Sequence, residues 1–275
     1  MRKRSLRTLI SLSFMTLLTG TLFLSPAAAL HTEAAVKSVR ICLDPGHGGD
    51  GDNNHGVERE YDGKMVMEKE ITLKLAEFLK EELVNYQGVK VSMTRKSDRK
   101  LSISSRISTA KKQNADYLIS LHINSANDSA DADKVKGCMV LLPASRYQPK
   151  GTKSKSIYDD CTRIGSAVVA NLTNLGLTLS SDLDADKTGG LVRRPYTIEA
   201  GATKNVKYPD GSYSDYYGLL RQGVEAGIPT LIIEHAYLSN ESDYRSYLSD
   251  DAALRTLAHA DAQALVDALE LKKRK

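Results

Sequence analysis

The chain has 275 residues, of which 26% are charged and 41% hydrophobic, with three cysteines. Its formal charge of +4 arises from the first 29 residues, which hold four basic and no acidic residues, so the remainder is formally neutral with 34 of each. A neutral domain gives no support to nucleic-acid binding, and three cysteines are too few for a disulfide framework. The length that remains is sufficient for one large core.

Residues 1–29 have the organisation of a secretory signal peptide. Basic residues at the start precede an uncharged run from Leu9 to Leu24, and Ala27 and Ala29 fit the small residues that precede a cleavage site. We therefore expect a mature secreted protein that reaches the extracellular space or the cell wall. An uncleaved membrane anchor is the alternative.

Three further segments complete the expected domain organisation. Residues 30–37 form a short linker, 38–271 a single catalytic domain, and 272–275 a basic tail of sequence Lys-Lys-Arg-Lys. The tail is flexible in this interpretation and could contact anionic wall polymers or a membrane surface, although a solvated terminus without a role is the plainer alternative.

Apolar runs alternate with amphipathic segments along the domain, and this alternation predicts an α/β fold. The apolar runs typical of strands are Val39–Leu43, Val89–Thr94, Tyr117–His122, Cys138–Leu142 and Thr230–Glu234. The segments with helical periodicity begin near Met65, Ser102, Ser156 and Asp250. The last of these helices, about 250–271, is expected to cover one face of the sheet.

The first strand ends in Asp44-Pro45-Gly46-His47-Gly48-Gly49, which places a histidine among glycines. Glycine allows a sharp turn without side-chain bulk, so His47 can reach a cleft as a metal ligand or a base. The alternative is a tight turn in which the histidine bonds a backbone carbonyl.

Glu68 lies on the apolar stripe of the first predicted helix. It precedes Ile71 by three residues and Leu75 by seven, so it is expected to point inward, where a carboxylate needs a partner. The alternative is an acid that simply interacts favourably with the first turn of the helix.

His122 is expected at the carboxyl end of a central strand, and His47 ends its own strand in the same sense. Because open α/β sheets build their sites at these ends, the two histidines and Glu68 can converge into a three-ligand zinc site with an open position for water. His55 is the rival ligand, but its glycine- and asparagine-rich loop gives it no fixed direction, so we place it at the rim of the cleft.

Glu234 closes the apolar strand near the C-terminus, where a general base could take a proton from a metal-bound water. A helix cap or a salt bridge is the alternative role. His235 should point to the opposite face of the sheet and support packing rather than bind metal.

Three further residues are candidates for a substrate-binding rim. Arg106 could bind a substrate carboxylate or form an ion pair on a helix surface. Asn124 shares a strand face with His122, and Arg193 lies in a long polar, tyrosine-rich region, 144–215, of the kind that often forms a binding rim. These three residues are the rim candidates.

Four segments in this order resemble the zinc-dependent N-acetylmuramoyl-L-alanine amidases of the amidase 3 family over about residues 38–270. They are Asp44-Pro45-Gly46-His47-Gly48-Gly49, Glu68-Lys69-Glu70, Ser120-Leu121-His122-Ile123-Asn124-Ser125, and the apolar strand ending in Glu234 with Ser239-Asn240 after it. The sequence departs from the family in His235-Ala236-Tyr237 and in a long stretch between Pro143 and Pro229.

The resemblance implies Zn²⁺ bound by His47, Glu68 and His122, with Glu234 as the catalytic acid and base. It also implies a mixed, mostly parallel sheet of about six strands flanked by helices. The substrate would be peptidoglycan, glycan plus stem peptide, cut at the amide between the lactyl group of N-acetylmuramic acid and L-alanine. Separately, we expect the protein to be a monomer. Two alternatives remain: a zinc peptidase acting within the stem peptide, and a catalytically silent wall-binding protein.

Overall fold

A computed structural model describes residues 38–51, 54–126 and 132–274. The expected signal peptide and linker, 1–37, lie outside the described residues. Within the described ranges, no helix combines the length and apolar character that a membrane span requires.

The central sheet has six strands in the order β4-β1-β5-β8-β6-β7. The strands are β1 (Val39–Pro45), β4 (Val89–Met93), β5 (Tyr117–Asn124), β6 (Met139–Leu142), β7 (Leu191–Arg193) and β8 (Thr230–Tyr237). Pairing is parallel throughout except between β6 and β8, which are antiparallel. The predicted mixed, mostly parallel sheet is confirmed, although β7 had not been foreseen in the polar region where it lies.

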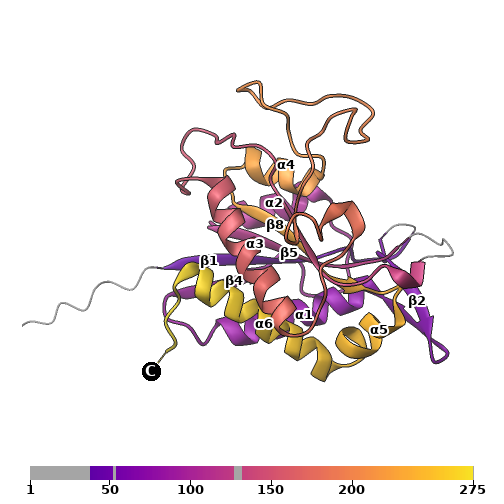
Figure 1. The fold of residues 1–275 in the computed structure, drawn as a ribbon. Helices are drawn as coiled ribbons and strands as arrows, with labels where there is room; N and C mark the ends of the chain where they lie inside the picture. Colours follow the sequence, from indigo (N-terminus) through magenta and orange to yellow (C-terminus); the bar gives the residue numbers. More distant parts are fainter. Residues whose placement is uncertain (1–37, 52–53, 127–131, 275) are drawn as a thin grey trace, which may run out of the picture. The chain divides into compact units, whose positions relative to one another are not determined.

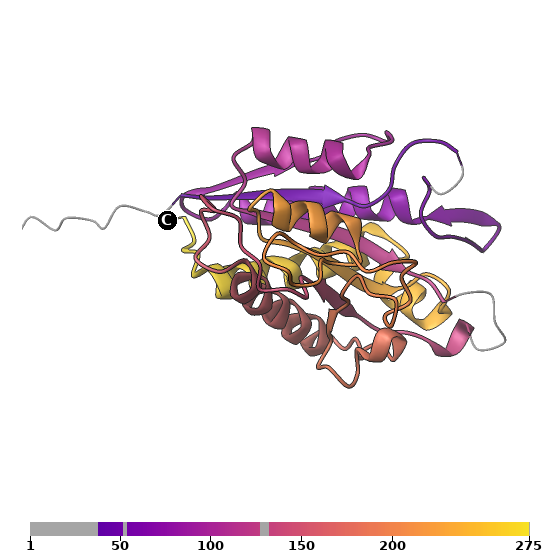
Figure 2. The same cartoon turned by 90° about the horizontal axis from the view of Figure 1, so that it is seen from above.

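Helices cover both faces of this sheet (Figure 1). On one face α1 (Glu68–Leu83), α3 (Ile157–Asn174) and α6 (Asp251–Leu269) pack together, and on the other α2 (Ile103–Lys112) packs against α4 (Gly218–Glu225). The view from above separates α2 from α3, which lie on opposite sides of the strands (Figure 2). Short turns complete the described elements: α5 (Glu241–Asp243), η1 (Ala132–Lys134), η2 (Asp182–Asp184) and η3 (Tyr244–Leu248).

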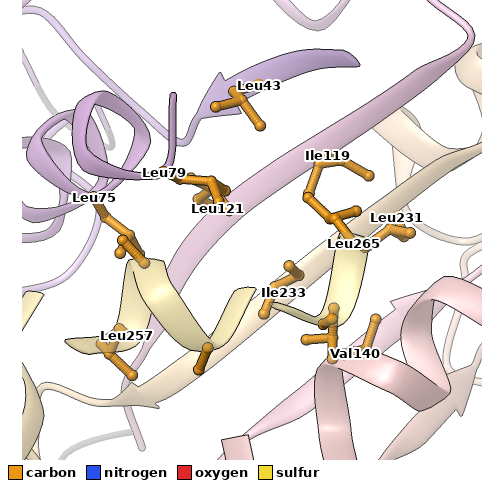
Figure 3. Close-up of a cluster of buried hydrophobic side chains, with 14 of the residues drawn as sticks. Leu43, Leu75, Leu79, Ile119, Leu121, Val140, Leu231, Ile233, Leu257 and Leu265 are labelled. Atoms are coloured by element: carbon orange, nitrogen blue, oxygen red, sulfur yellow. The ribbon is translucent and has the colours of Figure 1, made fainter. Parts of the chain in front are cut away.

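Alternation along the strands divides the apolar residues between two clusters. Leu43, Ile119 and Leu231 face α1 and α6 and meet Leu79 and Leu265 in a fully buried layer (Figure 3). Their neighbours in the strands, which point the other way, form a smaller cluster with α2 and α4. Full burial of each such side chain contributes about 1.5–3 kcal/mol, so the larger cluster provides most of the apolar stabilisation.

A hairpin stands where the sequence pattern had placed the start of the first helix. Strands β2 (Glu58–Tyr61) and β3 (Lys64–Met67) pair antiparallel, and α1 begins only at Glu68. The two turn residues, Asp62 and Gly63, have φ of 53° and 73°. Positive φ at both positions is the geometry that Asp-Gly favours in two-residue hairpins. The dipeptide therefore indicated a hairpin at a place where helical periodicity suggested the start of a helix.

The basic C-terminus is not free along its described length. Backbone groups of Lys272 and Arg274 pair with those of Gln87 and Asn85, and Lys273 bridges to Tyr86. This differs from the expected flexible tail, because the backbone itself is paired. All three cysteines are free and buried.

Candidate metal centre

His47, Glu68 and His122 meet at one edge of the sheet. Each offers a ligand atom, and these atoms lie within 4.8 Å of one another. The Glu68 carboxylate joins the two rings, with His47 Nε2 at 3.2 Å from Oε2 and His122 Nδ1 at 2.9 Å from Oε1. The rings themselves pack edge to face at 5.1 Å between centroids. The structure thus brings together the three residues that the sequence suggested as metal ligands.

Glu68 is fixed by the backbone around it. It is the first residue of α1, directly after β3, and only 2% of it is exposed. The amides of Val57 and Ile123 donate to its two oxygens, each at 3.0 Å. Gly56 has no room for a side chain, since a Cβ there would lie 2.3 Å from Oε2. The carboxylate therefore has one accessible orientation, between the histidines.

The loop that carries His47 is held by buried cations. His47 has φ of 57°, a left-handed conformation that is unfavourable for a residue with a Cβ. Arg106 donates to the carbonyls of Pro45 and His47, both at 2.7 Å. Arg95 donates to the carbonyl of Gly46 at 2.8 Å. Buried polar groups need such partners, and here the partners also fix the direction of the loop.

The same guanidinium of Arg106 makes a buried ion pair with Asp44 at 2.7 Å. The Asp44 carboxylate also accepts from Ser120 at 2.8 Å and from the Thr94 hydroxyl at 2.5 Å, so both members of this buried ion pair have further hydrogen-bond partners. Further along the loop, Lys69 donates to the carbonyl of Gly49 at 3.2 Å. These contacts connect the His47 loop to β5, β4 and α1.

His122 lies in β5, and the backbone of Gly46, directly after β1, passes against its ring. A Cβ on Gly46 would lie 2.5 Å from His122 Cε1, closer than real contacts allow. Position 46 therefore has to be glycine, because any side chain there would collide with the ring of His122. This close approach is a reason for glycine at this position that the sequence pattern alone, which suggested turn flexibility, did not reveal.

The electrostatics of the cluster favour a charged carboxylate. Burial alone would raise the pKa of Glu68, but its hydrogen bonds to His122 and His47 outweigh burial and lower it. Burial would likewise lower the pKa of His122, whereas the hydrogen bond and charge of Glu68 raise it to about 9. A bound dication would compete with the proton for the histidine nitrogen that faces Glu68.

Glu234 lies beside the cluster on the neighbouring strand. It pairs in register with His122 across β5 and β8. Burial raises the pKa of Glu234 to about 7, with the charge of His122 acting against that rise and the charge of Glu68 adding to it. A carboxyl group with this pKa can both accept and donate a proton near neutral pH.

His235 points to the opposite face of β8, as predicted. It is fully buried, with Nε2 at 2.8 Å from the Asp261 carboxylate of α6 and Nδ1 at 3.1 Å from the carbonyl of His122. Burial would lower the pKa of His235, but Asp261 raises it. Because both ring nitrogens face acceptors, the imidazolium form donates to each of them.

The three rim candidates each have a partner within the protein, and Arg106 also lines the cavity beside the histidines. Arg106 is buried and engaged with Asp44 and the His47 loop, so its guanidinium is a support for the loop. Asn124 donates to the hydroxyl of Tyr237 at 3.0 Å. Arg193 contacts the carbonyl of Pro143 from edge strand β7, which β6 separates from β8.

Two further outcomes concern residues near the ligands. His55 lies outside the cluster and pairs with Glu58 at 3.3 Å. Sequence reasoning missed Arg95 and Lys69, whose roles depend on contacts distant in the chain. Only the placement of Arg95 directly after a predicted strand could have suggested that it lies near the sheet edge.

A cavity of about 380 Å³ opens beside the histidines on the face covered by α2 and α4. Its lining includes His47, His122, Ile103, Tyr217 and Ile232. We call it the α2–α4 cavity. It is large enough to hold part of a small ligand next to the cluster.

The donor set defines a class of site. Two imidazole nitrogens and one carboxylate are ligands that suit zinc, and an open fourth position with a carboxyl group beside it is typical of metal-dependent hydrolases. The residues present suit this metal, since the three donors lie within 4.8 Å of one another and backbone amides orient the carboxylate.

A family model described as N-acetylmuramoyl-L-alanine amidase, Amidase_3, matches residues 41–267, and the chain therefore belongs to this family. It is 28% identical over 238 residues to the sporulation-specific N-acetylmuramoyl-L-alanine amidase of Bacillus subtilis, covering 86% of this chain and 70% of that protein. It is 36% identical over 237 residues to the probable N-acetylmuramoyl-L-alanine amidase AmiB of Haemophilus influenzae, covering 83% of this chain and 51% of that protein.

The fold is also similar to solved structures. The N-acetylmuramoyl-L-alanine amidase from Clostridium difficile 630 matches with a TM-score of 0.58 at 19% identity, covering 85% of this chain and 97% of that chain. At this identity the likeness concerns the fold alone. The curated relatives are longer, and this chain spans about half to two thirds of most of them.

Proposed function

We propose that the protein is a zinc-dependent N-acetylmuramoyl-L-alanine amidase that acts on peptidoglycan. The reaction breaks the amide between the lactyl group of N-acetylmuramic acid and L-alanine, and releases the stem peptide from the glycan. The observation that carries this proposal is the cluster of His47, Glu68 and His122 within 4.8 Å, with Glu234 in register beside it. Family membership supports the substrate.

His47, Glu68 and His122 would hold the zinc. When bound, the metal supplies a Lewis acid that polarises the scissile carbonyl and acidifies water. Glu234 takes a proton from the attacking water at its carboxylate, while a C–O bond forms to the carbonyl carbon. It then returns this proton to the nitrogen of L-alanine as the C–N bond breaks, which leaves a carboxylic acid on the glycan and a free amine on the peptide; at neutral pH the acid loses its proton and the amine gains one.

The raised pKa of Glu234, about 7, supports both proton transfers. A dication at the cluster would favour the ionised carboxylate, so Glu234 should be a base in the resting enzyme and an acid after the water has reacted. The expected signal peptide and the wall-directed names of the relatives support action outside the cytoplasmic membrane.

The test uses purified protein and a defined muramoyl peptide, with chelator or with added zinc, and identifies the products by mass. We expect intact stem peptide with a free L-alanine amine only when zinc is present. Glu234→Gln should lower kcat by at least about 1000-fold while zinc remains bound. Glu77→Gln, an exposed glutamate on α1, is the matched control and should leave kcat unchanged.

The products separate the alternatives. Cleavage within the stem peptide with the lactyl amide intact would identify a zinc peptidase. A protein that binds one zinc and cuts nothing would be held inactive by its own loops or would need a partner. A protein that binds no zinc would overturn the ligand assignment and favour the silent wall-binding protein.

A further inference from the structure

The α2–α4 cavity has an unusual lining for a site that faces an acidic substrate. Apolar side chains from three different segments form its wall, and His47 and His122 form one side; the wall includes Leu101, Ile103, Tyr217 and Ile232. Of the described residues that line it, Asp44 and Arg106 are the only charged ones besides the histidines, and they pair with each other at 2.7 Å. Away from the metal ligands, the wall of the cavity therefore offers no unpaired charge to a carboxylate.

Part of this wall is open to solvent. Ile103, the first residue of α2, has 39% of its surface exposed. It stands beside Gly218 at the start of α4, where an added Cβ would lie 3.0 Å from its Cδ1. A large apolar side chain at the edge of a cavity is typical of a ligand-binding wall, since nothing in the described chain covers it.

The cavity lies on the side of the metal cluster formed by the histidines and not on the side of Glu234. Ile232 lines it and shares a face of β8 with Glu234, but Glu234 is not among the lining residues. In the proposed reaction the departing amine must lie at Glu234, which returns the proton. The acyl half of the substrate then extends toward the histidines and the cavity.

We propose that the α2–α4 cavity binds the N-acetylmuramoyl residue of the substrate, and that the acidic stem peptide lies outside it. This inference rests on the proposed amidase function and adds the orientation of the substrate. A neutral sugar with its lactyl and acetyl methyl groups matches an apolar wall without free charge, whereas a peptide carboxylate would lose hydration there without gaining a partner.

Tyrosines extend this wall outward from the cavity. Tyr217 meets Tyr216 edge to face at 5.5 Å between ring centroids, and Tyr216 meets Tyr196 at 5.6 Å. Arg194 stacks on Tyr216, 3.7 Å from its centroid. This aromatic row begins at the cavity and continues into the segment that projects beyond α4 (Figure 1), where the next sugar of a glycan would lie.

The experiment compares two substrates with the same scissile bond. One is a muramoyl peptide, and the other is the lactoyl peptide that has the same stem but lacks the sugar. Ile103→Ala should lower kcat/KM for the muramoyl peptide by about tenfold, mainly through KM, and change that for the lactoyl peptide by less than about twofold. Met65→Ala, which removes a side chain that is 49% exposed on β3, should affect neither.

A second variant and a binding measurement make the result independent of turnover. Gly218→Ala narrows the cavity at the same wall. It should also lower kcat/KM for the muramoyl peptide more than for the lactoyl peptide. In the Glu234→Gln background, Ile103→Ala should weaken binding of the uncleaved muramoyl peptide about tenfold, as measured by calorimetry.

Equal losses for both substrates would place the common peptide in the cavity and overturn the proposal, as would no change for either. If the unmodified, zinc-loaded protein cuts neither substrate, the amidase function fails, and the binding measurement alone then decides what occupies the cavity.

Discussion

The two histidines of the cluster are positioned in different ways. His47 lies on an irregular loop, and its backbone is held by the side chains of Arg106 and Arg95. His122 and Glu234 lie on adjacent strands, and their positions follow from parallel backbone pairing between β5 and β8. One half of the site depends on a few buried cations, and the other on the sheet.

This difference predicts where the site is vulnerable. A single substitution can release the loop, because each carbonyl there has one or two donors. A substitution behind the strands leaves the backbone ladder in place, so it should cost stability without moving the ligand. Zinc affinity, measured alongside the free energy of unfolding, separates these two cases.

Gly46→Ala should have the largest effect on zinc affinity. Its Cβ would lie 2.5 Å from the ring of His122, so loop and strand could no longer approach each other. We expect about a 100-fold loss of zinc affinity, measured by competition with a chelating dye. Gly218→Ala is the control, since its nearest neighbour is the end of the Ile103 side chain and not a ligand. Unchanged zinc binding in Gly46→Ala would contradict this close approach.

Arg106→Met should have the next largest effect on zinc affinity. It leaves the Asp44 carboxylate buried without a countercharge, which typically costs about 3–5 kcal/mol of unfolding free energy. The His47 carbonyl also loses its donor. Zinc affinity should fall at least about tenfold, and Arg106→Lys should recover part of the stability but less of the affinity, because an ammonium cannot reach all three acceptors.

The control for Arg106 is Arg255→Met. Arg255 is an exposed arginine paired with Glu81 at 2.8 Å. Replacing it with methionine should lower the free energy of unfolding by less than about 1 kcal/mol and leave zinc affinity unchanged. If Arg106→Met and Arg255→Met had similar zinc affinities, the loop would not depend on its buried cation.

Asp98→Asn should have a smaller effect that depends on pH. Asp98 accepts from Lys69 at 2.7 Å and from the Gly49 amide at 2.6 Å, and these bonds lower the pKa of its carboxyl. A lowered pKa stabilises the fold above the unfolded value of about 4, and this contribution is lost as pH falls through the folded value. Because 45% of the side chain is exposed, screening limits it to less than about 1 kcal/mol.

The measurement is urea unfolding at pH 7 and at pH 3.5. The unmodified protein should lose more unfolding free energy on acidification than Asp98→Asn does, while zinc affinity at pH 7 changes by less than about threefold in the variant. An identical loss in both proteins would show that Asp98 does not hold the loop.

The strand half of the site was more predictable from sequence than the loop half. Apolar runs that end in His122 and Glu234 locate both residues at carboxyl ends, because parallel strands share that edge. The ion pair of Arg106 and Asp44 joins residues 62 positions apart, and no local pattern indicates which carbonyl or carboxylate an arginine will reach. The start of α1 was misplaced for a different reason, since the local Asp62-Gly63 turn signal was present but the helical periodicity was preferred to it.

Asp261→Asn tests the strand half and should have the smallest effect on zinc. The substitution removes the charge beneath His235, which is then expected to become neutral, with Nδ1 donating to the carbonyl of His122 and Nε2 accepting from the amide. Losing a buried charged bond should cost about 1–3 kcal/mol in urea unfolding. Zinc affinity and kcat/KM should stay within about threefold, because β5 and β8 still pair from Leu118 to His122. A loss of zinc affinity as large as that in Arg106→Met would mean that the strand end, like the loop, relies on a single buried ion pair.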